Sequence, residues 1–156
     1  MAAPELMTDS VAFQLAKLGQ LATARFIDRL APLGLRPRHC AVLALLAGPP
    51  VSQLELANQV GVTPSVVGEM LDELQAIGAV RRIRDNSDRR RQLTKLTGRG
   101  RALSRRANEL AHQIDRELLA NCSAQQGIAL RNTLRQLADT DNLPGKSRDR
   151  IVTDEA

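Results

Sequence analysis

Aromatic residues are almost absent from the sequence: Phe13 and Phe26 are the only two, and there is no tryptophan or tyrosine. Proteins that bind RNA or single-stranded DNA stack bases on aromatic side chains, so this chain has little with which to do so. Long apolar runs are missing as well, and the N-terminus lacks the basic segment, apolar run and small-residue cleavage site of an export signal. We therefore expect a cytoplasmic protein with no membrane partner, and duplex as its nucleic acid if it binds one.

Histidine and cysteine are scarce, with two of each. His39 and His112 are isolated in the sequence, and neither Cys40 nor Cys122 has the CxxC spacing of a zinc or dithiol site. No close carboxylate pair with a nucleophile accompanies them, so the sequence predicts no metal site, no cofactor and no catalytic constellation. The chain is predicted not to be an enzyme.

Positive charge is concentrated in one block. The formal net charge of the 156-residue chain is +5, yet residues 81–106 hold eleven Arg or Lys against two Asp. Such a block is the footprint of a protein that binds a polyanion, because neutralising phosphates releases condensed counterions. Charge alone leaves a solvated basic face as the alternative.

Apolar residues at helical spacing predict amphipathic helices along most of the chain. The first runs over residues 9–30 and ends at Pro32 and Gly34, and a short buried helix follows Pro37. A long helix is expected to begin after Thr97, which can cap it, and a last helix after Ser123. The sequence predicts one domain over residues 9–139, with flexible tails at residues 1–8 and 142–156.

Two short helices with a tight turn between them are predicted in the middle of the chain. Ser52 and Glu55 have the spacing of a capping box at the start of the first, in which Leu54 and Ala57 are expected to face inward. Thr63 is expected to cap the second. Its inward stripe is Val67, Met70, Leu71 and Leu74, and its opposite face holds Ser65, Glu69, Asp72 and Ala76. This is the helix-turn-helix pattern, whose second helix can present its first turns to the major groove of DNA.

A β-hairpin is predicted directly after the second helix. Residues 80–84 and residues 92–96 each alternate apolar and polar side chains, and Asp85, Asn86 and Ser87 stand between them. A hairpin in this place would form the wing of a winged helix-turn-helix.

The order of these elements resembles the MarR family of transcription regulators. The residues that carry the resemblance are the run Asp88-Arg89-Arg90 with Leu96-Thr97 and Gly100, preceded by Gly78 and Val80, and it extends over roughly residues 15–137. It implies a mainly α fold with a small β-wing, in which residues 37–96 form the winged helix-turn-helix lobe and residues 9–32 and 97–139 form dimerisation helices. It also implies a homodimeric repressor, or less often an activator, that a small phenolic or anionic ligand releases from its operator.

The terminal helices present more apolar face than a lobe of this size can cover, which also favours a homodimer over an intramolecular bundle. A two-fold dimer would bring two recognition helices to successive major grooves of double-stranded DNA, so a pseudo-palindromic operator is expected.

The resemblance further implies that Arg90 at the tip of the wing enters the minor groove, while Asp88 holds its guanidinium in place. A narrow minor groove concentrates negative potential, which suits a weakly hydrated guanidinium. An ordinary exposed ion pair is the alternative. Arg84 and Arg91 are expected nearer the phosphates. The candidate DNA-binding residues are Ser52, Thr63, Ser65, Val66, Glu69, Arg84, Asp88, Arg89, Arg90 and Arg91.

The second helix departs from the family, because positions that often carry Ser or Thr and then Arg hold Gly68 and Glu69. Glu69 can accept from a cytosine amino group, or it can repel phosphate and oppose nonspecific binding. Thr63 can be a cap alone, and Ser65 a solvated residue of the first turn.

Two other functions stay open. An acidic recognition helix can bind a protein partner instead of DNA. Cys40 can sense oxidants, since Arg38 and His39 beside it favour a thiolate, although a cysteine in a helix is more often a small packing residue. Family members that sense peroxide carry their cysteine in the first helix, and this chain has none there.

Overall fold

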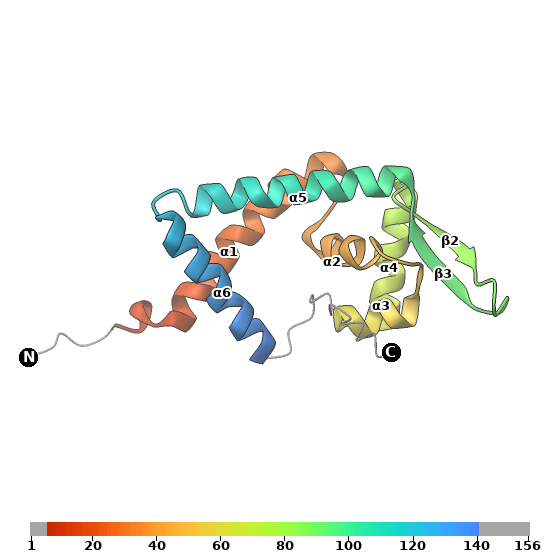
Figure 1. Cartoon of the computed structure of the whole chain (residues 1–156), viewed down its shortest axis with the longest axis horizontal. Coiled ribbons are helices and arrows are strands. Elements are labelled where there is room, and N and C mark those ends of the chain that lie inside the picture. Colours follow the sequence, from red (N-terminus) through yellow and green to blue (C-terminus); the bar gives the residue numbers. More distant parts are fainter. Residues whose placement is uncertain (1–5, 141–156) are drawn as a thin grey trace, which may run out of the picture.

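The computed structural model describes residues 6–140 of the chain. One long helix, α5 (Gly98–Leu118), runs between two groups of elements (Figure 1). At one end lie α1 (Val11–Leu30) and α6 (Ala124–Thr140). At the other lie α2 (Pro37–Leu45), α3 (Gln53–Val60) and α4 (Pro64–Ala76), with the strands β1 (Val51–Ser52), β2 (Val80–Arg84) and β3 (Gln92–Leu96). The fold is mainly α with a small wing, as the sequence predicts.

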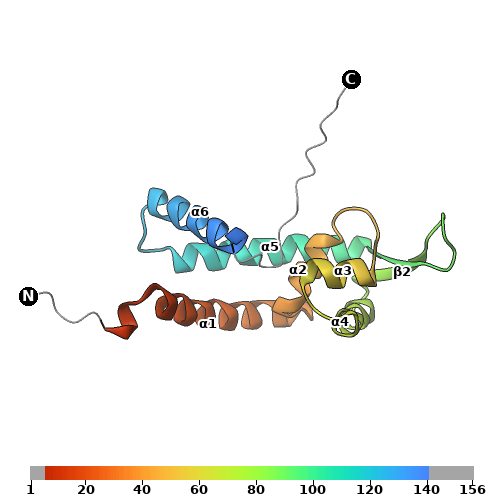
Figure 2. The ribbon, with the colours of Figure 1, turned by 90° about the horizontal axis from the view of Figure 1, so that it is seen from below.

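The three strands form one antiparallel sheet in the order β1-β3-β2. In the β2–β3 hairpin, Val80 pairs with Leu96 and Arg84 pairs with Gln92, so the strands have the bounds predicted from their alternating pattern. Beyond Arg84 the hairpin projects away from the helices as a wing (Figures 1 and 2).

Side-chain caps set the starts of the helices. Ser10 accepts from the amide of Phe13, so α1 begins at Val11, and the predicted start at residue 9 lies in a short 3-10 helix, η1 (Met7–Asp9). The predicted caps Thr63 and Thr97 accept from the amides of Val66 and Gly100. The last predicted start is also correct, because Ser123 and Gln126 exchange two hydrogen bonds before α6.

The core lies in the lobe, where the apolar faces of α2, α3 and α4 meet the sheet and the first half of α5. The inward stripe predicted for α4 is buried along its whole length. The inward position of Leu54 in α3 was predicted wrongly: this side chain is 60% exposed, whereas Leu56 and Ala57 are buried. The phase error arises because α3 has only eight residues, too few turns for the apolar pattern to select one face.

Outside the lobe the helices keep their apolar faces exposed. Helix α1 contacts α5, and Leu15, Leu18 and Leu21 remain exposed along it. Helix α6 makes few contacts with the rest of the described chain, and Leu130, Leu134 and Leu137 are exposed on it. Between residues 6 and 140, no helix is both long enough and apolar enough to cross a membrane. The tail predicted at residues 142–156 and most of the tail predicted at residues 1–8 lie outside the described residues.

Candidate nucleic-acid interface

Helix α4 presents a polar outward face over the lobe. Ser65, Glu69 and Asp72 are exposed, and Val66 is half-buried. The Thr63 side chain accepts from the Val66 amide at 3.4 Å, so it is engaged as a cap at the start of this face. In a helix-turn-helix this is the face that enters the major groove, and we call α4 the recognition helix.

The tip of the wing is a loop held by backbone hydrogen bonds. The Asp85 amide donates to the Arg91 carbonyl at 3.0 Å, and the Arg91 amide donates to the Asp88 carbonyl at 2.9 Å. Oδ1 of Asp88 accepts from the backbone amide of Arg90 at 3.0 Å. Asp88 therefore holds the backbone of Arg90, and its hold on the Arg90 guanidinium stays a prediction. It still fixes the place from which the Arg90 side chain leaves the loop.

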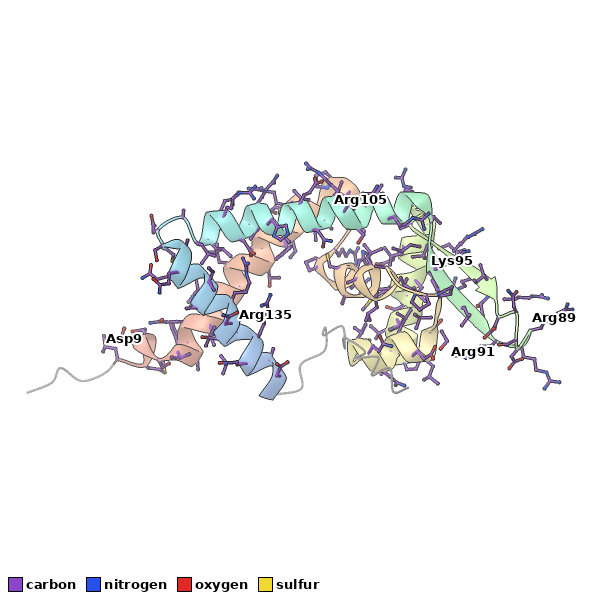
Figure 3. The ribbon with its side chains drawn as sticks, in the orientation of Figure 1. Asp9, Arg89, Arg91, Lys95, Arg105 and Arg135 are labelled. Atoms are coloured by element: carbon purple, nitrogen blue, oxygen red, sulfur yellow. The ribbon has the colours of Figure 1, made fainter. Side chains whose placement is uncertain are left out.

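Three consecutive arginines, at positions 89 to 91, lie at this tip, and their side chains point in different directions. Arg89 and Arg90 are exposed, and Arg89 lies at the far end of the wing (Figure 3). Arg91 turns back toward α3, where its Nη2 lies 2.8 Å from Oε2 of Glu55. Arg84 is exposed at the end of β2.

Glu55 joins the wing to the capping box of α3. The same Oε2 accepts from the Ser52 hydroxyl at 2.7 Å and from the Ser52 amide at 3.0 Å. These bonds from Ser52, followed by the Arg91 guanidinium, hold the pKa of Glu55 below its usual value. The Ser52 hydroxyl is thus bonded to Glu55, and Arg91 joins the wing to α3 through the same carboxylate.

A second brace joins the wing to the recognition helix. On β2, Arg82 donates to Oδ1 of Asp72 at 2.6 Å and to Oε1 of Gln75 at 3.0 Å. The contacts of Arg82 were not predicted from the sequence, because the sequence of a basic strand does not show which side chains its arginines will bond. The two braces fix the position of the wing relative to α3 and α4.

An ionic cluster around the buried His39 lies between α2 and the recognition helix. His39, predicted to be isolated, is only 2% exposed and its Nε2 lies 2.7 Å from Oε2 of Glu73. Its Nδ1 accepts from the Arg36 amide at 3.1 Å, so the neutral ring carries its proton on Nε2 and donates it to Glu73. Burial lowers the pKa of His39, which favours this neutral form.

Two arginines complete this cluster. Arg38 donates to Oε1 of Glu73, and Nη1 of Arg36 lies 3.6 Å from the same oxygen. The hydrogen bond from Arg38, followed by that from His39, lowers the pKa of Glu73 to about 2. The sequence missed this cluster because its members lie on different helices, and only folding brings them together.

The same two arginines line a cleft between α1 and α2. The cleft has a volume of about 600 Å³, and its other lining residues are Ile27, Ala31, Gly34, Leu35 and Pro37. Its lining is therefore mostly apolar and includes Arg36 and Arg38 at the start of α2.

Cys40 lies on α2 and packs against the hydrophobic core. Burial raises the pKa of its thiol, which opposes formation of the thiolate that a redox sensor needs. The geometry favours the packing interpretation of this residue. No group of three or more His, Cys, Asp or Glu in the described part of the chain is placed to hold a metal ion.

Comparison with known proteins decides the family. The sequence model of the MarR family matches residues 38–92, from α2 to the start of β3. The HTH-type transcriptional repressor Rv2887 of Mycobacterium tuberculosis is 32% identical over 126 residues, which are 80% of this chain and 91% of the repressor. The chain belongs to the MarR family. Its relatives are transcription regulators rather than enzymes, as the sequence predicts for this chain.

Solved structures of MarR proteins have the same fold. A MarR-family regulator from Rhodococcus sp. RHA1 superposes with a TM-score of 0.74 at 28% identity, covering 86% of this chain and 97% of that one. Rv2887 in complex with DNA gives a TM-score of 0.69 at 29% identity, with coverages of 82% and 97%. Rv2887 in complex with salicylic acid gives 0.67 at 31% identity, with coverages of 87% and 99%.

Proposed function

We propose that this MarR-family chain is a homodimeric transcriptional repressor that binds a pseudo-palindromic operator in double-stranded DNA. The observation that carries the proposal is the pairing of an exposed recognition-helix face with a basic wing, which Arg82 on β2 joins to Asp72 and Gln75 of α4. A DNA complex of the related Rv2887 supports it. Residues 37–96 form the DNA-binding lobe, and residues 9–32 and 97–139 form the dimerisation helices.

In this proposal Arg90 enters the minor groove and Ser65, Val66 and Glu69 face the major groove. Thr63 and Ser52 position the helix starts, and the side chains nearest the phosphates are Arg84, Arg89 and Arg91.

Selection of bound duplexes from a random pool tests the proposal. We expect an enriched palindrome with half-sites about one helical turn, or roughly 10 base pairs, apart. A pool that shows no enrichment, although the protein is folded, would exclude the proposal and favour the alternative of a protein-binding module.

The homodimer makes a separate prediction, based on the exposed apolar faces of α1 and α6. Without DNA, sedimentation equilibrium at low micromolar concentration is expected to give twice the 17.0 kDa mass of the chain. Leu134→Glu is expected to shift the protein toward the monomer, because it buries a charge in the interface. Leu54→Glu, on the exposed side of α3, is the matched control and is expected to leave the dimer intact. A parent protein that sediments only as the monomer would contradict the dimer.

A small anionic aromatic ligand is proposed to occupy the cleft between α1 and α2. Salicylic acid is bound in a structure of Rv2887, and here the cleft combines an apolar wall with Arg36 and Arg38. Because both arginines also hold Glu73 of the recognition helix, a carboxylate in the cleft competes with Glu73 for them. Ligand binding would thereby loosen the attachment of α4 and release DNA.

Salicylate is expected to release the selected operator from the parent, with Arg36→Ala requiring about tenfold more salicylate because a charged hydrogen bond is lost. Arg36 is the better variant because its side chain is the more exposed of the two. Arg105→Ala on α5 (Figure 3), a residue that does not line the cleft, is the control in a fluorescence-anisotropy titration. Equal salicylate sensitivity in the Arg36 variant and the parent would refute this ligand site.

A further inference from the structure

The recognition helix has no side chain at position 68, at the edge of its outward face. A Cβ placed on Gly68 would lie 2.8 Å from Nε2 of Gln53 and 3.6 Å from its Cδ. The space beside Gly68 is thus already filled by the carboxamide of Gln53, which comes from the first residue of α3. At this point a side chain from α3, that of Gln53, covers the surface of the recognition helix.

This carboxamide is held in a defined orientation. Its Nε2 donates to the Pro64 carbonyl in the first turn of α4 at 2.7 Å, and since a carbonyl only accepts, the amide nitrogen must be on that side. Gln53 directly follows Ser52, whose capping box with Glu55 fixes the start of α3. The Gln53 side chain is therefore fixed where the N-termini of the two helices meet.

One hydrogen-bonding edge of the amide is left over. Nε2 has a second N–H, and among the described residues no side chain or backbone group bonds to it or to Oε1. A glutamine that offers one N–H and one oxygen side by side matches the N7 acceptor and N6 amino donor of adenine in the major groove. Gln53 is half-buried, so part of its side chain reaches solvent where the carboxamide lies against Pro64 and Gly68 of the recognition helix.

We propose that Gln53 is a specificity-determining residue that reads one adenine in each half-site, from the position that a side chain at residue 68 would otherwise take. The proposal rests on the operator binding proposed above. It also explains why glycine stands at position 68: any larger residue would push the carboxamide away from the Pro64 carbonyl and from the groove.

The test compares duplex selections and competition titrations for the parent, Gln53→Ala and Gln59→Ala. Gln59 is exposed at the other end of the same helix and supplies the matched control. The parent and Gln59→Ala are expected to prefer adenine at one position of each half-site by about 5- to 150-fold over other bases. Gln53→Ala is expected to lose the preference at that position alone.

A purely structural role for Gln53 would weaken binding to all duplexes equally and leave every base preference in place. That result, with a parent that does enrich an operator, would overturn this proposal and leave the proposed function standing. A parent that enriches no duplex would overturn both.

Gly68→Ala provides a second variant that keeps Gln53 in the chain. Alanine is a better helix former than glycine, so circular dichroism and the melting temperature are expected to show an intact fold. Displacement of the carboxamide is expected to remove the preference at the same base pair, and the double variant is expected to behave as either single one. If Gly68→Ala keeps the base preference of the parent while Gln53→Ala loses it, the position of the carboxamide does not matter. That result would also overturn the proposal.

Discussion

Gly100→Ala is expected to destabilise the protein by about 3 kcal/mol, at the upper end of the usual cost of overpacking a close contact. A Cβ at this position would lie 1.9 Å from the Ala79 carbonyl oxygen and 2.8 Å from the Ala79 carbonyl carbon. Both atoms belong to the backbone, so no side-chain rotation can make room. Helix α5 would have to move away from the base of the wing.

That movement would also break the hydrogen bonds around Ala79. The Thr97 amide donates to the Ala79 carbonyl at 3.0 Å, and the Thr97 hydroxyl donates to the Gly78 carbonyl at 2.6 Å. The same hydroxyl caps α5 by accepting from the Gly100 amide at 3.0 Å. The single methyl group is therefore expected to disturb the cap of α5 and the start of β2 together.

Gly98→Ala is the matched control, since it lies in the same first turn of α5 and its added Cβ would meet nothing within 4 Å. Urea unfolding of both variants checks the prediction. Gly98→Ala is expected to match or slightly exceed the stability of the parent, because alanine is favoured over glycine in a helix. Equal midpoints for the two variants would show that α5 and β2 do not pack as described.

Most of the fold could be predicted because its signals are local. The caps at Thr63 and Thr97 and the stripe of α4 each depend on residues within one or two turns, and the hairpin follows from a period of two. The apolar pattern fails to predict the buried face of a short helix. Helix α3 has only eight residues, and Leu54 was assigned to its buried side although it is exposed. Local patterns predict an element best when it is long enough to repeat them.

The candidate site was less accessible to the sequence, because its geometry depends on pairs that folding brings together. Arg91 with Glu55, and His39 with Glu73, join elements that are distant in the chain. The sequence identified the arginine cluster of the wing but not which of its members are paired. It also showed that Gly68 departs from the family pattern, without revealing that Gln53 fills the space.

Arg90→Ala is expected to weaken binding to the selected operator by about 1 to 3 kcal/mol, as other specific contacts do, because a minor-groove arginine gains from a focused potential. The dimer is expected to remain intact, since Arg90 is exposed at the tip of the wing. Titrations at several salt concentrations check this, with Arg105→Ala on α5 as the control for loss of one positive charge.

Arg91→Ala tests whether Arg91 contacts a DNA phosphate or keeps its ion pair with Glu55. If Arg91 leaves Glu55 to meet a phosphate, its loss weakens specific and random duplexes alike and lowers the salt slope by about one. If it stays on Glu55, the slope is unchanged and Glu55→Gln weakens binding as well, because both substitutions release the wing from α3. We expect the phosphate contact.

Asp88→Ala tests whether net charge or the geometry of the wing tip decides the affinity for the operator. Removing an acid near DNA would strengthen binding if net charge alone decided the affinity. Because the Asp88 carboxylate accepts from the Arg90 amide, its loss frees the backbone that aims Arg90, and we expect weaker binding despite the gain in positive charge. The weakening is expected to disappear in an Arg90→Ala background, since no guanidinium remains to be positioned. Tighter operator binding by Asp88→Ala, or parental binding by Arg90→Ala, would exclude the wing from the role proposed for it.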